Sequence, residues 1–589
     1  MSSIDQQSKD DVKILHEMGY AQELTRGMGK FQNFAISFSI ICILSGGINS
    51  LAQATAGAGG AAIGIGWPIG CLISLVFGLA MAQISSAYPT AGGLYHWGSI
   101  LGNRFTGWLT AWFNLIGLVT VLAAINVGTW TFFGGSIAGW FGINGDNTTP
   151  DGYRNFVIFM IAITVIQAAI NHFGIKLTAM LTDFSGYLIF ATALLLTITC
   201  LVFAQSHDFS RLWTFTNYSG TPKGGEIWPQ SSNIWYIFAL GLLLPIYTIT
   251  GYDASAHTSE ETQGAAENVP RGIVSSILWS SLFGWIMLAA FVIMIPATAT
   301  IPDPADAAKT ITVPGMQAAA QQGWNVFFWG INATHPAWLA NLLYVLIFLS
   351  QFLCGLATVT SASRMIYAFS RDGGLPLSSV FKGVSPTFRT PVAAIWLAAA
   401  LSIIFSAFTQ VYTTVVSVTV IFLFLSFAVP IGLGLMAYGG SKWPKMGPWS
   451  LGQALFSLCA ILSVLGAILI FVIGIQPPNQ NALWITIGFI AMLGIFWFSM
   501  EKMAPIAWIG VVVAILGTYW VAAGLAFTGG KAFLGLDQPG AIFVGVIAVL
   551  LVALTALITG RSFAGPPIGD AIKKRQAEIA AAEAALAKG

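Results

Sequence analysis

Runs of apolar residues, each long enough to cross the hydrocarbon core of a bilayer, recur along almost the whole chain. A membrane-spanning α-helix needs roughly 20 such residues. Fourteen candidate runs are Phe34–Gln53, Ile63–Ala87, Trp108–Phe133, Phe156–Phe173, Leu177–Phe203, Asn233–Thr262, Ile273–Pro296, Leu339–Phe369, Val392–Phe408, Val411–Tyr438, Leu451–Ile475, Leu483–Ser499, Pro505–Phe527 and Ile542–Thr559. Lipid admits only helices or closed barrels, and these runs are too long and continuous for barrel strands. The sequence therefore predicts an all-α polytopic membrane protein with about 14 transmembrane helices.

The composition excludes several classes of function. Only 8% of the residues are charged, against roughly a quarter in soluble domains. The formal net charge of +2 is scattered over loops, so nothing indicates a nucleic-acid partner. The five cysteines lie inside apolar runs without metal-ligand spacing, and no HExxH, GxSxG or Walker-type motif occurs. We therefore expect no enzyme activity, no cofactor and no metal.

The distribution of lysine and arginine predicts the orientation in the membrane. If the N-terminus is cytoplasmic, the outer loops hold only five of the 24 basic residues: Arg154, Arg211, Lys223, Lys309 and Lys531. Cytoplasmic loops carry the excess of positive charge, so both termini are predicted to be cytoplasmic. Residues 1–30 show no signal peptide, and we expect an integral protein of the plasma membrane.

Two of the predicted spans are interrupted by glycine near mid-depth. The first contains Ser45-Gly46-Gly47, and the sixth contains Thr250-Gly251-Tyr252-Asp253. These spans are corresponding members of two five-helix halves. A matched pair of interrupted spans is the best sequence pointer to a transporter binding site. The alternative is that the first glycine pair merely lets two helices pack closely.

An interrupted helix exposes backbone groups that can bind the two ends of a zwitterion. The half-helix that begins near Gly47 would present N–H groups and a positive dipole end to a carboxylate. The half-helix that ends near Thr250 would present carbonyl groups to an ammonium. The predicted substrate-binding residues are Ser45, Gly46, Gly47, Ile48, Asn49, Ile249, Thr250, Gly251, Tyr252 and Asp253.

The polar residues after the second interruption allow several roles. Asp253 can cap the restarted helix, or it can act as an amine-binding anion or proton carrier. His257 can be a hydrogen-bonded structural residue or a group that titrates near neutral pH. Glu260 and Glu261 are predicted near the cytoplasmic face, where they are either solvated or part of an inner gate closed by ion pairs. The basic residues predicted on that side are Arg104, Lys176 and Arg271.

Four motifs in fixed order carry a resemblance to a known family. They are "LHEMGYAQELTRGMGKFQNFAISFSII" from Leu15, "YPTAGGLYHW" from Tyr88, "GYDASAHTSEET" from Gly251 and "SASRMIYAFSRDGGLP" from Ser361. Together they resemble the amino acid/choline transporter branch of the amino acid–polyamine–organocation permeases. The resemblance implies a leucine-transporter-like fold with an inverted five-helix repeat. It also implies alternating access and secondary transport of amino acids, GABA, choline or related amines.

The resemblance also suggests where a coupling ion could bind. Sodium-coupled proteins of this architecture complete their ion site with hydroxyl residues of the eighth span, here Thr358, Thr360 and Ser361. Some proton-linked relatives carry a lysine where this chain has Ile189, so that device is absent. Proton and sodium coupling both stay open. Arg364 and Arg371 are interpreted as anchors that reach from the end of this span to the interface.

The predicted organisation has six parts. They are a cytoplasmic N-terminal segment (1–30), two five-helix repeats (31–210 and 230–440), helices 11 and 12 (450–500), two additional helices (505–560) and a cytoplasmic tail (565–589). Within the tail, Asp570 to Lys588 are expected to form a solvated Ala-rich helix, with partner binding as the alternative. The family core normally has twelve spans, so the pair of helices after residue 505 is an addition of unknown role. A nutrient sensor built on a transporter scaffold is the alternative function.

Overall fold

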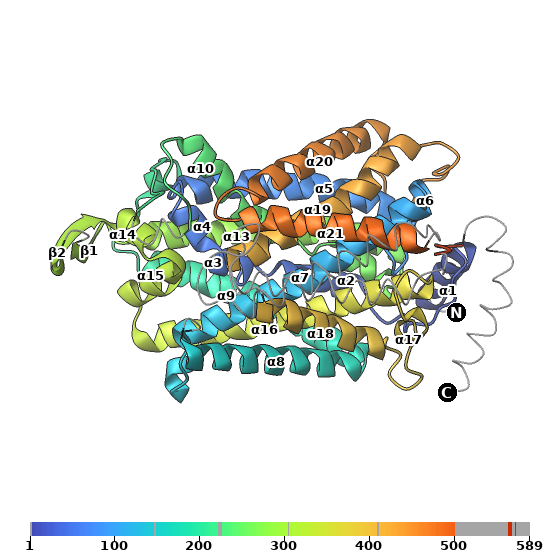
Figure 1. Ribbon diagram of the computed structural model, residues 1–589, viewed down its shortest axis with the longest axis horizontal. Helices are drawn as coiled ribbons and strands as arrows, with labels where there is room; N and C mark the ends of the chain where they lie inside the picture. The colour runs from blue at the N-terminus through green and yellow to red at the C-terminus, as the bar shows by residue number, and fades with distance from the viewer. Residues whose placement is uncertain are drawn as a thin grey trace.

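The computed structural model describes residues 3–500, except 147–148, 222–226, 304–305 and 409–411, together with residues 563–567 and 572. The described part is an elongated helical bundle whose long helices run along its longest axis (Figure 1). One end carries a β-hairpin, and the opposite end carries the first helix, α1 (Ser3–Glu17). We call these the hairpin end and the α1 end.

Helices account for nearly all of the described elements. The first predicted repeat contains α2 (Lys30–Ile41), α3 (Gly46–Asn49), α4 (Leu51–Thr55), α5 (Trp67–Ala87), α6 (Leu94–Leu101), α7 (Arg104–Ser136), α8 (Pro150–His172) and α9 (Ile175–Val202). The second contains α10 (Ile234–Gly241), α11 (Leu243–Thr248), α12 (Ala254–His257), α13 (Ala265–Met294), α14 (Gly315–Gln321), α15 (Val326–Thr334), α16 (Ala337–Arg371), α17 (Ser378–Phe381), α18 (Val392–Phe408) and α19 (Tyr412–Ala437). They are followed by α20 (Gln453–Gly474) and α21 (Gln480–Met500).

Membrane-crossing helices follow the predicted apolar runs. Among the described residues, nine helices are long and apolar enough to cross a bilayer, and three shorter apolar helices accompany them. Each of the first twelve predicted runs overlaps one of these helices. The last two runs, Pro505–Phe527 and Ile542–Thr559, lie outside the described residues, so the count of fourteen and the inverted repeat stay predictions.

Polar caps fix where several of these helices begin. The Asn103 side chain accepts hydrogen bonds from the N–H groups of Phe105 (2.9 Å) and Thr106 (3.0 Å) and so starts α7. Thr149 caps α8 in the same way, and Pro150 occupies its first position. Helix α7 is then almost entirely buried between α16, α18 and α19. It forms the centre of the bundle against which the functional residues pack.

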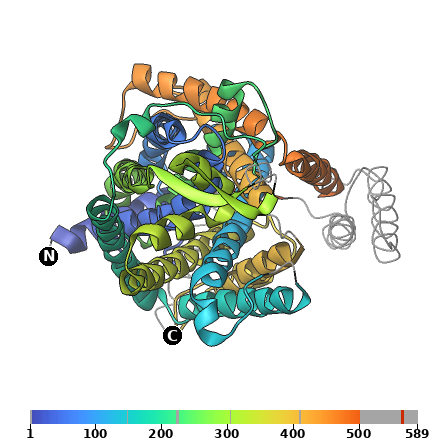
Figure 2. The same ribbon diagram turned by 90° about the vertical axis from the view of Figure 1, so that its left-hand side faces the viewer.

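A two-stranded antiparallel hairpin corrects the all-α prediction. Strand β1 (Thr298–Asp303) pairs with β2 (Asp306–Pro314), and Ile301 lies opposite Ile311. β-Branched Thr, Ile and Val residues favour extended strands, and both strands are rich in them. Figure 2, viewed toward the hairpin end, shows the hairpin in front of the helices. The hydropathy pattern alone predicts a loop between two spans for this segment.

Candidate functional site

The two helix interruptions meet in the interior of the bundle. The first interruption, residues 42–45, separates α2 from α3, and the second, residues 249–253, separates α11 from α12. A Cβ atom added to Gly46 would lie 2.8 Å from Thr248 Oγ1 and 2.9 Å from Thr248 Cα. The Gly46 backbone therefore touches the last residue of α11, and only glycine permits this approach. This contact is the close packing that glycine permits, and it brings the two interruptions together.

The first interruption lies one turn earlier than the sequence predicts. Helix α2 ends at Ile41, and the next helix starts at Gly46. The N–H groups of Gly46 and Gly47 donate to the carbonyl oxygens of Cys42 and Ile43, at 3.1 Å each. These two N–H groups are thus already satisfied in this conformation. The expectation that they are free for a carboxylate is wrong here, because a tight turn precedes the half-helix and supplies acceptors.

Helix α16 satisfies carbonyl groups that the first interruption releases. The Cys354 thiol donates to the Ile40 carbonyl (3.2 Å), and Gln351 Nε2 donates to the Leu44 carbonyl (3.2 Å). Asn49 Nδ2 in turn donates to Gln351 Oε1 (3.3 Å). Buried carbonyl groups need such partners. Sequence reasoning missed Gln351, and its only signal was an amide inside an apolar span.

The second interruption depends on a left-handed residue. Gly251 has a φ of +83°, a value that other residues rarely adopt. The next carbonyl, that of Tyr252, accepts a hydrogen bond from the Ser37 hydroxyl of α2 (2.9 Å). The Tyr252 ring lies 5.3 Å from the Phe427 ring of α19, and its hydroxyl has no hydrogen-bond partner within the described part of the chain. A buried, unpaired hydroxyl is costly unless a ligand completes it.

Asp253 is fully buried in a small polar network. Its Oδ2 atom accepts from Asn114 Nδ2 (3.0 Å) and lies 3.3 Å from His257 Nε2. The Asn114 amide also donates to the Ser426 hydroxyl (3.3 Å). The Oδ1 atom of Asp253 has no hydrogen-bond partner among the described residues. Asp253 precedes α12 but makes no side-chain cap, so the capping interpretation is wrong in this structure.

The predicted coupling-ion residues point in different directions. Thr358 donates to the Cys354 carbonyl of its own helix (2.9 Å). Thr360 donates to Asn171 Oδ1 of α8 (2.6 Å). Only Ser361 keeps a buried hydroxyl without a hydrogen-bond partner in the described ranges. The three hydroxyls therefore do not converge on one cation in this conformation.

Two buried ion pairs lie where the chain leaves α12. Arg364 Nε and Nη2 donate to the two carboxylate oxygens of Glu261 at 2.9 and 2.8 Å, and these side chains are 1% and 0% exposed. Arg371 Nη1 and Nη2 contact Glu260 at 3.1 and 2.9 Å. We call Glu260, Glu261, Arg364 and Arg371 the ion-pair cluster. Bidentate arginine–carboxylate pairs combine charge with fixed geometry.

The cluster corrects three sequence interpretations. Glu260, Glu261 and Arg364 are buried, and Arg371 is mostly buried with its side chain 10% exposed, so the carboxylates are not solvated and the arginines are not surface anchors. Of the predicted partners, Arg271 pairs instead with Glu267 at 3.4 Å on the surface. Arg104 donates to the Phe563 carbonyl (3.2 Å), and the Lys176 side chain lies outside the described part. The missed signal was the seven-residue spacing of Arg364 and Arg371, which is two helical turns on one face.

The segment before α2 closes over the cluster. We call residues 20–28 the N-terminal strap. Met28 N donates to the Glu261 carbonyl (2.8 Å), and Gln263 N donates back to the Met28 carbonyl (2.9 Å). Arg26 donates to the carbonyls of Ser259 (3.2 Å) and Thr262 (2.5 Å). Burial lowers the pKa of Arg26, opposed mainly by nearby Asp11.

Aromatic hydroxyls extend the cluster toward the surface of the α1 end. The guanidinium of Arg371 lies 3.8 Å from the ring centroid of Tyr20 in the strap. The hydroxyls of Tyr20 and Tyr95 both donate to Asp372 Oδ2, at 2.7 and 3.0 Å. The N-terminal strap and α6 are thereby joined to the end of α16 at Asp372.

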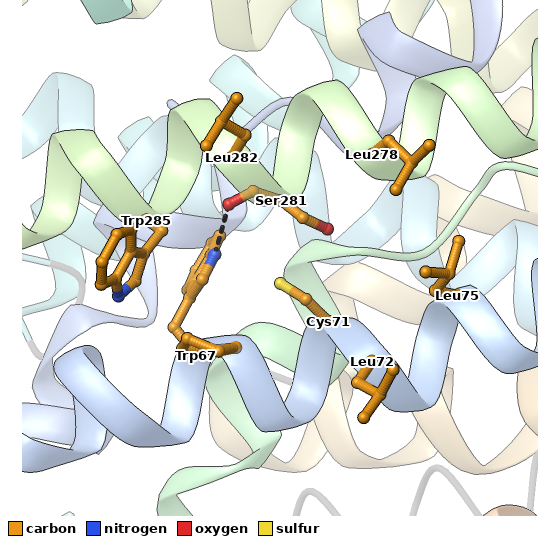
Figure 3. A pocket seen from close by; sticks show the side chains of 9 residues that line it. Trp67, Cys71, Leu72, Leu75, Leu278, Ser281, Leu282 and Trp285 are labelled. Atoms are coloured by element: carbon orange, nitrogen blue, oxygen red, sulfur yellow. Dashed lines mark hydrogen bonds between the residues drawn. The ribbon is translucent and has the colours of Figure 1, made fainter.

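A mostly apolar groove of about 310 Å³ lies between α5 and α13, apart from the interruptions and the ion-pair cluster (Figure 3). Its walls are mostly apolar and include Trp67, Leu72, Leu278 and Trp285. The Trp67 indole donates to the Ser281 carbonyl (2.9 Å) and ties the two helices together. Its lining contains no charged side chain.

Comparison with known proteins assigns the family. A family model described as amino acid permease matches residues 28–498. The chain belongs to the amino acid permease family. The match contains both interruptions and the whole ion-pair cluster, and it confirms the resemblance noted in the four motifs. The protein is thus a permease and not an enzyme.

Three similar proteins illustrate the range of relatives. Amino-acid permease BAT1 of Arabidopsis thaliana is 33% identical over 453 residues, covering 74% of this chain and 83% of its own. Its homolog in Oryza sativa subsp. japonica is 31% identical, with 74% and 82% covered. The GABA-specific permease of Saccharomyces cerevisiae is 27% identical over 405 residues, with 67% and 66% covered. These relatives support amino acid transport by an integral membrane protein.

Proposed function

We propose that this permease is a secondary active transporter that moves an amino acid or a related amine across the plasma membrane by alternating access. The contact between Gly46 and Thr248 carries this proposal, because it places the two interruptions at one buried point. A rearrangement of either half-helix must change that point. Transporters of this kind bind solute where irregular backbone lines a cavity between repeats.

The substrate's two ends have different proposed partners. The amine binds at the Asp253–Asn114 network, where each side chain keeps one buried oxygen without a hydrogen-bond partner in the described part. The carboxylate binds at the first interruption, near Ser45. The turn at residues 42–45 must then open, because Gly46 and Gly47 have satisfied N–H groups in the closed form.

The ion-pair cluster is the proposed inner gate. Two buried bidentate pairs and the strap that covers them close the α1 end, which we assign to the cytoplasmic side together with both termini. The basic residues of the sequence support this orientation. Opening the gate would hydrate four charges at once, which offsets the loss of their pairing.

Protons are the proposed coupling ion. Asp253 and His257 form a buried pair inside the bundle, and buried ionisable residues within membrane spans mark proton relays. At the first interruption, the Ile40 carbonyl already accepts a thiol hydrogen bond, and the hydroxyls of Thr358 and Thr360 do not converge. These contacts favour proton coupling over sodium coupling.

Uptake into proteoliposomes tests the proposal. Purified protein is first screened by thermal shift against amino acids, GABA and choline, because a bound ligand raises the melting temperature. The ligands found are then offered with an imposed pH gradient, an imposed sodium gradient or neither. Accumulation driven by the pH gradient alone is expected. Binding without any flux would contradict transport and favour a sensor, and sodium-driven accumulation would contradict proton coupling.

A further inference from the structure

A short segment near the C-terminus, Phe563–Pro567, is buried against the α1 end of the bundle. Phe563 is 1% exposed, and Gly565, Pro566 and Pro567 are also buried, whereas Ala564 is exposed. The sequence predicted a cytoplasmic tail over residues 565–589. Residues 565–567 of this stretch are buried against the bundle.

Phe563 contacts three helices. Its ring lies 6.3 Å from the Tyr95 ring of α6 and 5.9 Å from the Phe369 ring of α16, measured between centroids. Its carbonyl oxygen accepts a hydrogen bond from Arg104 Nη1 at the start of α7 (3.2 Å). The Phe563 ring therefore joins α6 to α16, and its backbone carbonyl adds the start of α7. Aromatic pairs at these separations add to the gain from burial.

Pro567 contacts the chain immediately before the N-terminal strap. A Cβ atom on Gly19 would lie 2.6 Å from Pro567 Cγ, so the proline ring rests on bare backbone. Gly19 has a φ of +82°, which only glycine adopts readily. The next residue, Tyr20, donates its hydroxyl to Asp372 (2.7 Å) and lies under Arg371. The segment thus touches the chain one residue before Tyr20, where the strap begins and contacts the ion-pair cluster.

We propose that Phe563–Pro567 is a C-terminal latch that docks on the surface formed by Gly19, Tyr95, Arg104 and Phe369 and stabilises the closed inner gate. This inference rests on the proposed role of the ion-pair cluster as that gate. Opening requires the strap to leave the cluster, which separates Gly19 from Pro567. The latch therefore binds the closed form only, and it shifts the equilibrium by its differential affinity for the two forms.

A buried cysteine reporter tests the latch. The five native cysteines are replaced by alanine or serine, and Ser259→Cys is introduced, because Ser259 is buried beside the cluster and its carbonyl accepts from Arg26. A membrane-impermeant thiol reagent is applied to the α1 side. Phe563→Ala is expected to raise the labelling rate by at least about tenfold, since burying a phenylalanine side chain shifts an equilibrium by roughly that much or more. Ala564→Ser is the matched control and should leave the rate unchanged.

One further variant, Arg371→Gln, separates failure of the latch from failure of the gate. It opens the gate directly and should raise the labelling rate whether or not the latch exists. If Arg371→Gln raises labelling and Phe563→Ala does not, the latch is refuted and the gate stands. If neither changes it, the gate proposal fails as well.

A truncated chain that ends at Ser562 guards against a folding defect in Phe563→Ala. It should label rapidly, and a synthetic peptide of residues 560–572 should slow the labelling again. Rapid labelling that the peptide does not slow would overturn docking of this segment.

Discussion

Removing the arginine of the Glu261–Arg364 pair should leave a carboxylate buried without its partner. Both side chains are essentially inaccessible, and both carboxylate oxygens accept from the guanidinium at 2.8 and 2.9 Å. Breaking such a pair from one side costs about 3–5 kcal/mol. Since each 1.4 kcal/mol is a factor of about ten, Arg364→Gln should shift the closed–open equilibrium by roughly a hundredfold to several thousandfold.

A double-mutant cycle measures this effect. Arg364→Gln, Glu261→Gln and the double variant are compared by thermal unfolding in detergent and by labelling of a cysteine at position 259. Each single variant should unfold at a lower temperature and label faster. The double variant should recover most of the loss, because two neutral amides replace the charges. Arg271→Gln is the control, since its pair with Glu267 is half-exposed and contributes at most about 1 kcal/mol.

The cycle has a clear refuting result. If the two single effects simply add in the double variant, the charges do not act as a pair. If Arg271→Gln is as damaging as Arg364→Gln, burial is not the cause of the effect. Either outcome would remove the physical basis of the proposed gate.

Three other predictions concern the interruptions and the strap. Gly46→Ala should abolish ligand-induced thermal stabilisation, because its Cβ meets Thr248 at 2.8–2.9 Å, whereas Gly47→Ala should retain it, since its nearest neighbours lie at 3.5 Å or beyond. Equal effects would contradict the proposed contact point. Asp253→Asn should lose accumulation driven by a pH gradient, and unchanged accumulation would argue against proton coupling there. Burial raises the pKa of Asp11 above its usual value of 3.8, and Arg26 and two backbone N–H donors oppose this shift. The folded state therefore binds the proton more tightly than the unfolded state does. The contribution of Asp11 to folding stability then falls as the pH rises past 3.8. The melting temperature of Asp11→Asn should therefore rise relative to that of the original chain as the pH rises above 3.8, and a constant difference would refute this assignment.

Local patterns in the sequence predicted most of the fold. Apolar runs located the helices of the described part, because hydrophobic length is a property of neighbouring residues. Glycine and polar residues within spans one and six located both interruptions to within about a turn. The hairpin β1–β2 was missed because its alternation of Thr, Ile and Val is short and lies between two strong hydrophobic signals.

Long-range partners could not be predicted in the same way. Glu261 and Arg364 are 103 positions apart, and Glu260 and Arg371 are 111 positions apart. A hydropathy argument assigns such charges to water, because it does not see the opposite charge that makes burial tolerable. The capping role for Asp253 failed for a related reason: its partner Asn114 lies on another helix, 139 positions away.

The N-terminal strap has a thermodynamic consequence, because it runs directly into α2, whose end is the first interruption. Closure of the ion-pair cluster and occupation of the interruption therefore act on one continuous piece of chain. Linkage requires that such effects be reciprocal. Consider an antibody fragment or peptide that binds only the closed strap. A solute that favours the closed cluster must increase the affinity of this binder by some factor. The binder must then increase the affinity for the solute by the same factor. The affinity of a strap binder would thus report how much of the first interruption is occupied by solute.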